Sequence, residues 1–188
     1  MNTRRALLLG HFSTVGDIAC LDFISGCLRE KGIPFDTCAF MDEVRKNLAS
    51  CLSPQNLTPG KYSHLIFICG PCWPEMLAQQ GINIAEFAHC SRIALNTTMI
   101  LPVKDWNPFQ HLLERDSYRH ARPDLSFYTP METVPVTGLC LISEQGEYGD
   151  RQRHRETSAA IHALLKKFGL GAYRFGHALA ALAECDQC

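Results

Sequence analysis

Two cysteines separated by a glycine and a proline, Cys69 and Cys72, have the type and spacing that most directly suggest chemistry. Such a pair between a strand and a helix can exchange disulfides, because a helix N-terminus stabilises a thiolate and lowers its pKa. The residues before Cys69, Phe67 and Ile68, are bulky and apolar. Because burial favours the neutral thiol, we predict that the pKa of Cys69 is raised and that the pair is unreactive.

Thioredoxins share only these four residues with the chain. They carry a tryptophan before the first cysteine, whereas Ile68 stands there in this sequence and Trp73 follows the second cysteine. In the preferred interpretation, Gly70 and Pro71 form a tight turn that leaves the strand, and the two thiols flank it by chance. Thiol–disulfide exchange by Cys69 and Cys72 is the alternative function.

The stretch GHFSTVGD, residues 10–17, is a second candidate site because two glycines bracket a loop that leads into a helical pattern. Glycine lets a backbone approach a ligand, and a helix N-terminus attracts anions. We therefore predict that the substrate contacts His11, Thr14, Gly16 and Asp17. The alternative is that Asp17 only caps the helix. Because the spacing is not GxGxxG, no dinucleotide fingerprint is present.

A charged stretch, EQGEYGDRQRHRE at 144–156, follows an apolar run that resembles a strand. Charged groups after the carboxyl end of a strand can bind a sugar or an anion. The alternative is a solvated loop that continues into the charged first turn of a helix. We predict that the substrate site includes Glu147, Arg151, Arg153 and His154, and that at least one of the last three faces the glycine loop.

Composition restricts the class of protein. The chain has 188 residues, with 18 basic and 19 acidic ones. Because the charges are balanced and mixed, we expect no nucleic-acid partner. No apolar run is long enough for a membrane span or a signal peptide. Ten cysteines without a secretion signal indicate free thiols in a reducing cytoplasm. The histidine spacing predicts no metal site, and we expect none. The alternative is a four-cysteine zinc site made by the pair Cys69 and Cys72 with the pair Cys185 and Cys188.

Apolar runs alternate with helical patterns along the first part of the chain. This alternation predicts a doubly wound α/β domain with a parallel sheet of four or five strands. In such sheets ligands bind at the carboxyl ends of the strands, where both the glycine loop and the turn of Gly70 and Pro71 should lie. The expected strands are 5–10, 34–40, 64–70 and 92–99, with helices from Ile18 to Lys31 and from Pro74 to Gln80.

The rest of the chain is predicted to contain a helix at 108–117, an extended piece at 122–130, a strong strand at 135–143 and a helix that ends at Phe168. We place a Rossmann-like N-terminal domain at 1–132. Residues 133–188 would then form the first strand and helix of a second, incomplete domain, unless the strand at 135–143 extends the first sheet.

Several stretches, in the right order, resemble the polysaccharide pyruvyl transferase family. LLLGHFSTVGDIACLDFISGCLREKG is similar to the family's opening strand, glycine loop, Gly-Asp pair and helix. HLIFICGP resembles a later strand that ends in a glycine turn. LLERDSYRHARPDLSFYTP is similar to the family's Arg-Asp-x-x-Ser segment and the strand after it. VPVTGLCLISEQGEYGDRQRH resembles the start of the second domain.

The resemblance implies a glycosyltransferase-B-like pair of Rossmann-like domains facing a cleft. The family moves a pyruvyl group from phosphoenolpyruvate onto two hydroxyls of a sugar, in polysaccharide biosynthesis. The acceptor would meet the first domain, where Gly70 and Pro71 line the cleft, and the resemblance implies no cofactor. The family's Thr-Arg-Leu-His motif does not occur in this sequence. We therefore expect the chain alone to be incomplete for catalysis, working with a partner chain or as a homo-oligomer, or else as a non-catalytic binding subunit.

Overall fold

The computed structural model describes residues 4–115, 123–128 and 146–168. By its internal contacts the chain divides into two units, Met1–Val134 and Pro135–Cys188. Each unit is described separately.

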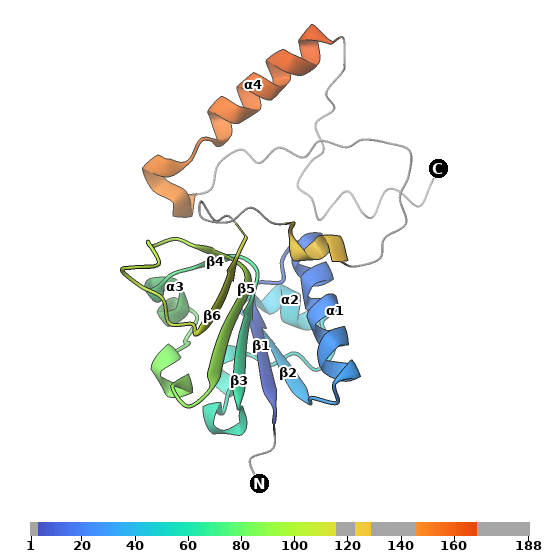
Figure 1. Cartoon of the computed structure of the whole chain (residues 1–188), viewed down its shortest axis with the longest axis vertical. Coiled ribbons are helices and arrows are strands. Elements are labelled where there is room, and N and C mark those ends of the chain that lie inside the picture. The colour runs from blue at the N-terminus through green and yellow to red at the C-terminus, as the bar shows by residue number, and fades with distance from the viewer. Residues whose placement is uncertain (1–3, 116–122, 129–145, 169–188) are drawn as a thin grey trace. The chain divides into compact units, whose positions relative to one another are not determined.

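The first unit is an α/β domain built on a parallel sheet (Figure 1). β1 lies between β2 and β3, β5 follows β3, and both β4 and β6 pair with β5. Every pairing among the described strands is parallel. This arrangement confirms the predicted α/β class and is Rossmann-like. The strands are β1 (Ala6–Gly10), β2 (Phe35–Ala39), β3 (His64–Ile68), β4 (Pro71–Cys72), β5 (Ser91–Met99) and β6 (His111–Glu114).

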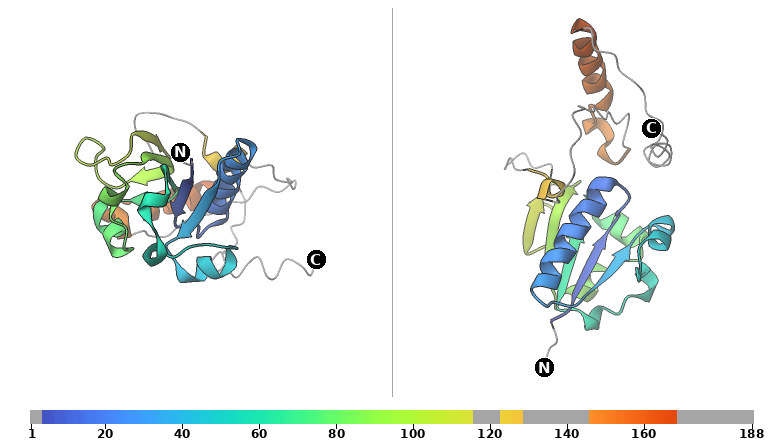
Figure 2. Two further views of the ribbon diagram at one scale, coloured as in Figure 1. Left: turned by 90° about the horizontal axis from the view of Figure 1, so that it is seen from below. Right: turned by 90° about the vertical axis from the view of Figure 1, so that its right-hand side faces the viewer.

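Three α-helices of this unit connect the strands: α1 (Val15–Glu30), α2 (Asp42–Asn47) and α3 (Pro74–Gln79). Figure 2 shows α1 lying along one face of the sheet. Shorter 3-10 turns complete the connections at Pro54–Asn56, Pro59–Lys61 and Ile84–Phe87. The helices predicted from Ile18 to Lys31 and from Pro74 to Gln80 are confirmed as α1 and α3. Each ends one residue before the predicted end, and α1 begins three residues earlier than predicted, at Val15.

Two hydrophobic cores lie on opposite faces of the sheet, because successive side chains of a strand point to opposite sides. Leu8 of β1 and Ile66 of β3 pack in the core that contains α1. Leu7 and Leu65 pack in the core that contains α3. A strand buried on both faces reads as a continuous apolar run, which is why β1 and β3 were recognisable from the sequence.

Two predicted elements are wrong. The predicted helix at 108–117 contains β6, which pairs with β5 through hydrogen bonds from Gln110 N to Arg92 O and from Arg115 N to Thr97 O, both 2.9 Å. The adjacent leucines of this stretch fit a helix or a strand equally well, so only the pairing partner decides. The predicted extended piece at 122–130 contains a 3-10 turn, Leu125–Tyr128.

The second unit is described over 146–168. A turn of 3-10 helix, Gly146–Arg151, precedes α4 (His154–Lys167), and Phe168 follows as its C-cap. The predicted helix ending at Phe168 is thereby confirmed. The predicted strand at 135–143 lies outside the described residues. Among the helices that the structure describes, none has the length and apolar character needed to cross a membrane.

Candidate functional site at the carboxyl edge of the sheet

The strand order places a topological switch point between β1 and β3. From β1 the chain runs to β2 on one side, and from β3 it runs toward β5 on the other. Gly10 pairs with Ile68, so the loops that follow these two strands start side by side. Ligands of open α/β sheets bind at the carboxyl ends of strands where the connections diverge in this way.

Two glycines let the loops after β1 and β3 touch. A Cβ atom on Gly10 would lie 2.4 Å from the carbonyl oxygen of Ile68. Gly70 has a φ of 74°, and a Cβ atom there would lie 2.6 Å from Cδ2 of His11. The His11 ring therefore sits directly against the backbone of Gly70, and the predicted residues His11, Gly70 and Pro71 share one location.

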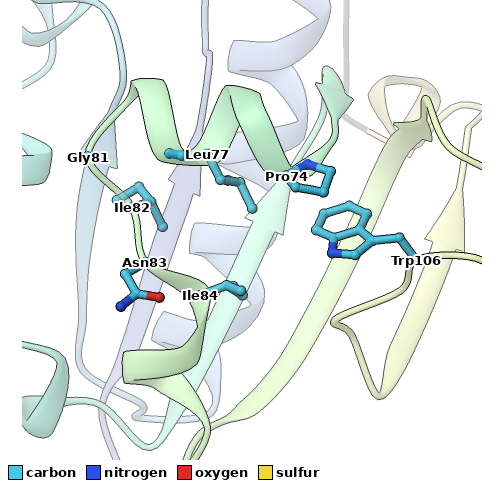
Figure 3. Close-up of a pocket in the computed structure, with 8 residues that line it drawn as sticks. Pro74, Leu77, Gly81, Ile82, Asn83, Ile84 and Trp106 are labelled. Atoms are coloured by element: carbon cyan, nitrogen blue, oxygen red, sulfur yellow. The ribbon is translucent and has the colours of Figure 1, made fainter.

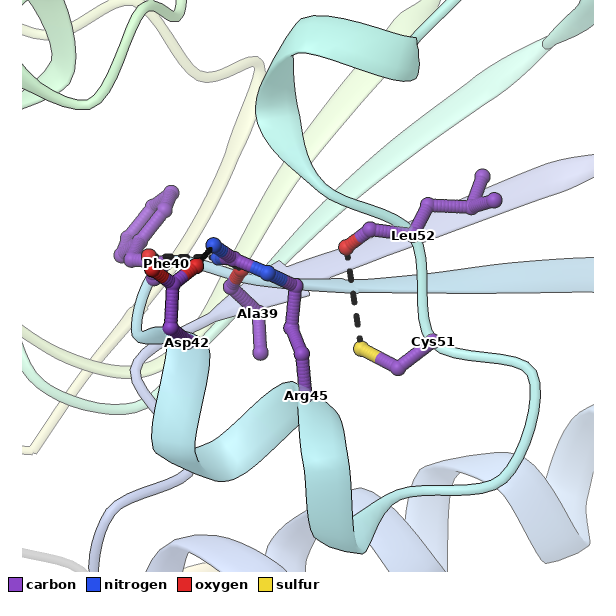
Figure 4. Close-up of polar contacts among 6 residues, drawn as sticks. All are labelled: Ala39, Phe40, Asp42, Arg45, Cys51 and Leu52. Carbon is purple, nitrogen blue, oxygen red and sulfur yellow. Dashed lines mark hydrogen bonds and ion pairs between the residues drawn. The ribbon is translucent and has the colours of Figure 1, made fainter.

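Arg45 on α2 holds the end of β2, the strand next to β1 (Figure 4). Its Nη1 donates to the carbonyl oxygens of Ala39 and Phe40, each at 2.6 Å, and Nη2 forms an ion pair with Asp42. The Phe40 ring meets the His11 ring edge-on, with centroids 4.9 Å apart. Arg45 thus fixes the end of β2 and, through Phe40, the position of the His11 ring.

The start of α1 is held by a capping box. Thr14 Oγ1 accepts from Asp17 N at 3.1 Å, while the Asp17 carboxylate accepts from Ser13 N and Thr14 N, both at 3.2 Å. Asp17 is buried, so its carboxylate serves the amides of its own loop. Thr14 and Gly16 are exposed on the same turn. A Cβ atom on Gly16 would make only ordinary contact, at 3.8 Å from Thr14 Oγ1.

A buried polar group at the end of β5 was not predicted from the sequence. Asn96, Thr97 and Thr98 are all buried, and the register of β5 shifts between Leu95 and Thr97. Asn96 has a φ of 57°, an uncommon backbone conformation for a residue within a strand. Three successive polar residues at the end of an apolar strand were the available signal.

Arg115 brings a positive charge to the same edge. Its Nη2 donates to Thr98 Oγ1 at 3.2 Å. Burial alone would raise the pKa of nearby Asp124, but hydrogen bonds from Ser126 and Asn96, together with the charge of Arg115, lower it. Arg115 lies in the stretch LLERD, which the sequence analysis connected with a family motif but assigned to a helix.

The two cysteines of the CGPC motif face different cores. Cys69 packs with the α1 core and Cys72 with the α3 core, and neither is accessible to solvent. Burial raises the pKa of Cys72 to about 12. A hydrogen bond with Cys20, and then burial, raise the pKa of Cys69. The predicted direction of the shift at Cys69 is confirmed.

The predicted site residues of the second unit lie in and after its 3-10 turn. Glu147 and Arg151 belong to the turn Gly146–Arg151, and Arg151 is exposed. Arg153 forms an exposed ion pair with Glu156 at 3.6 Å. The ring of His154 lies 5.9 Å from that of Tyr148. That one of them faces the glycine loop of the first unit stays a prediction.

A separate apolar groove of about 430 Å³ runs beside α3 (Figure 3). Pro74 and Trp106 lie close together at one end of this groove. Asn83, its main polar residue, accepts from Ala85 N at 3.2 Å and donates to Glu86 at 3.3 Å. Asn83 therefore already has hydrogen-bond partners, and the other side chains that line the groove are mainly apolar.

Neither a metal-binding cluster in the described part of the chain nor a known relative identifies the function of this site. Among the described residues, no group of three or more histidine, cysteine or acidic side chains is placed to hold a metal ion. The chain matches no family model, no curated protein and no solved structure.

Proposed function

We propose that the first unit is the acceptor-binding half of a polysaccharide pyruvyl transferase-like protein. It would bind a sugar at the carboxyl edge of its sheet. A second Rossmann-like domain, in a glycosyltransferase-B-like arrangement, would bring phosphoenolpyruvate to that sugar. In this proposal the first unit acts in polysaccharide biosynthesis, and turnover requires a second domain or a partner chain.

The sequence resemblance supports this proposal through the order of its segments. Three of them, GHFSTVGD, ICGP and LLERD, are far apart in the chain. The first two begin side by side after β1 and β3, because Gly10 pairs with Ile68. The third brings Arg115 onto Thr98 at the end of β5, the strand next to β3. A shared edge is the arrangement expected if the three segments serve one ligand.

The observation that carries the proposal is the chemistry exposed at the switch point. Thr14 and Gly16 present an open, uncharged turn of helix, and the half-buried His11 lies beside them in the loop. Hydroxyl, imidazole and backbone groups can hydrogen-bond the hydroxyls of a sugar. Arg115 adds a guanidinium that suits an acidic substituent, because its fork of N–H donors matches a carboxylate or phosphate.

The binding test uses the full chain and two glycine variants of α1. Saturation-transfer NMR and calorimetry would be run with phosphoenolpyruvate, with neutral hexoses, and with acidic and N-acetylated sugars. Gly16→Val should abolish sugar binding by covering the exposed turn. Gly26→Val is the matched control, because Gly26 lies on the same helix, a Cβ atom there would have no neighbour within 4 Å, and the variant should retain the parent affinity. Equal sugar affinity in the parent and both variants would refute the proposed site.

Turnover separates the enzyme from the binding subunit. Transfer of pyruvate to two sugar hydroxyls releases inorganic phosphate from phosphoenolpyruvate, which a colorimetric assay detects. Sugar binding without phosphate release by the chain alone fits either an incomplete enzyme or a non-catalytic subunit. Phosphate release that appears when a separate second-domain protein is added would identify the enzyme.

Thiol–disulfide exchange by the CGPC pair is disfavoured by geometry. Cys69 and Cys72 are both inaccessible and belong to cores on opposite faces of the sheet. A disulfide needs Cβ atoms about 3.5–4.5 Å apart with their bonds directed toward each other. Insulin-reducing activity that is lost in Cys72→Ser would restore this alternative.

A further inference from the structure

The thiol near Cys69 in the core is that of Cys20 on α1, rather than that of Cys72. Asn96 Nδ2 donates to both sulfur atoms, at 3.4 Å each, so the two thiols share one donor group. The Cys20 thiol also contributes to raising the pKa of Cys69. Both cysteines are in the same core and are inaccessible to solvent. Two cysteines that are 49 positions apart in the sequence (69 minus 20) therefore form a close dithiol.

A short segment, 123–128, covers this dithiol. Asp124 Oδ1 accepts from Asn96 Nδ2 at 3.0 Å and lies 3.8 Å from the sulfur of Cys20. Asn96 Oδ1 in turn accepts from Leu125 N at 3.4 Å. At the other end of the segment, the Tyr128 ring stacks on Phe23 of α1, with centroids 5.6 Å apart.

The hydrogen bonds of Asn96 link the position of segment 123–128 to the two thiols. An amide nitrogen has only two N–H groups, yet three acceptors surround Nδ2: Cys20, Cys69 and Asp124. The thiols and the carboxylate therefore share the same two donors. A change at the sulfur atoms alters the bonds that hold Asp124, so the segment and the dithiol are physically coupled.

We propose that segment 123–128 is a strap over a redox-sensitive dithiol, and that lifting the strap lets a small-molecule disulfide oxidise Cys20 and Cys69 to a disulfide bond. That bond would join α1 to the end of β3 beside the switch point. The proposal does not depend on the nature of the substrate.

The oxidation balances with a low-molecular-weight disulfide such as oxidised glutathione. One thiolate, formed by loss of its proton to solvent, attacks the oxidant and gives a mixed disulfide with release of one glutathione thiolate. The second protein thiolate then attacks the cysteine sulfur of that mixed disulfide. The Cys20–Cys69 bond forms, a second glutathione leaves, and two electrons have passed to the oxidant.

Thiol labelling measures the strap in the reduced, full-length protein. Iodoacetamide labelling followed by peptide mass mapping gives a rate for each cysteine. Cys27 is the control for an accessible thiol, because it is partly exposed on the same helix as Cys20. Cys90 is the control for general unfolding, because it is buried in the other core. In the parent, Cys20 and Cys69 should label at least about tenfold more slowly than Cys27.

Two variants loosen the strap from different ends. Asp124→Ala removes the acceptor for Asn96 and should accelerate labelling of Cys20 and Cys69 by about tenfold or more, with Cys90 unchanged. Tyr128→Ala removes the ring that stacks on Phe23 and should accelerate the same two thiols by a smaller factor. The Tyr128 side chain is 56% exposed, so this variant decides the question if Asp124→Ala does not fold.

Cross-linking tests the identity of the pair. After treatment with oxidised glutathione, Asp124→Ala should give a peptide cross-linked through Cys20 and Cys69, more rapidly than the parent does. Adding Cys69→Ser should remove that peptide, whereas adding Cys72→Ser should leave it. The proposal is overturned if Cys69 cross-links to Cys72 instead, or if neither strap variant changes the labelling of Cys20 and Cys69 relative to Cys90.

Discussion

Replacing Gly70 by alanine tests the contact on which the candidate site is built. The added methyl group would lie 2.6 Å from Cδ2 of His11, and the backbone of Gly70 has a φ of 74°. Two separate costs therefore arise: the left-handed backbone conformation and the clash with the imidazole ring. We expect the variant to fold with reduced stability, because only the side chain of His11 has to move.

The magnitude follows from these two terms. A left-handed conformation costs an alanine about 1–2 kcal/mol. About 0.4–1 kcal/mol of that is recovered because alanine restricts the unfolded chain more than glycine does. Inserting a methyl group into a packed contact costs about 1–3 kcal/mol. The free energy of unfolding should therefore fall by about 2–4 kcal/mol, and the midpoint of thermal unfolding by about 5–15 °C.

Two further variants separate the terms. Gly32→Ala carries the backbone cost alone, because Gly32 has a φ of 63° and no atom within 4 Å of a Cβ position. It should lose about 1 kcal/mol. His11→Ala removes the ring that the new methyl group meets. In that background the cost of Gly70→Ala should fall to the value for Gly32→Ala.

Urea unfolding followed by tryptophan fluorescence and circular dichroism gives the free energies of unfolding of the parent, the three single variants and the double variant. A Gly70→Ala cost equal to that of Gly32→Ala would refute the close contact between His11 and Gly70. So would a Gly70→Ala cost that stays the same with and without the His11 ring. Either result would remove the geometric basis for placing His11 at the switch point.

Three other predictions concern stability and thiol reactivity. Asp17→Ala should lower the free energy of unfolding by about 0.5–2 kcal/mol in a urea titration, because the capping box of α1 loses its carboxylate; an unchanged value would count against that role. The hydrogen bond from Arg5 lowers the pKa of Asp36 in the folded protein. The ionised Asp36 therefore stabilises the fold fully above the pKa of the unfolded state, near 3.8, and this stabilisation is lost as the pH falls through the lower pKa of the folded state. Asp36→Asn should therefore destabilise the protein at pH 7, by about 1 kcal/mol or less for this partly exposed pair, and have almost no effect near pH 2; equal destabilisation at both pH values would contradict this. Because the pKa of Cys72 is raised to about 12, its alkylation by iodoacetamide should still be rising above pH 9; a midpoint near pH 7 would contradict the burial of this thiol.

Some elements could be predicted from the sequence because their own residues carry the signal. β1 and β3 are recognisable because a strand covered on both faces is apolar at every position. A capping role for Asp17 could be considered from the sequence, because capping bonds form within a few residues of chain. The helix was nevertheless predicted to begin at Ile18, three residues after its observed start at Val15. The direction of the pKa shift at Cys69 was also predictable. Its largest cause is the interaction with Cys20, which only the fold supplies, but burial at the end of an apolar strand acts in the same direction.

Contacts between residues that are distant in the sequence could not be predicted, because they depend on how the chain folds. β6 was predicted as a helix, because two adjacent leucines carry no period and β5 supplies the missing hydrogen-bonding partner. In the alternative interpretation of the sequence, Cys72 was the partner of Cys69 because the two are three positions apart. The left-handed conformation of Cys69 and the alternation of the sheet direct these two thiols to opposite cores. Cys69 meets Cys20 instead, because strand order and helix packing, rather than spacing along the chain, determine which side chains share a face.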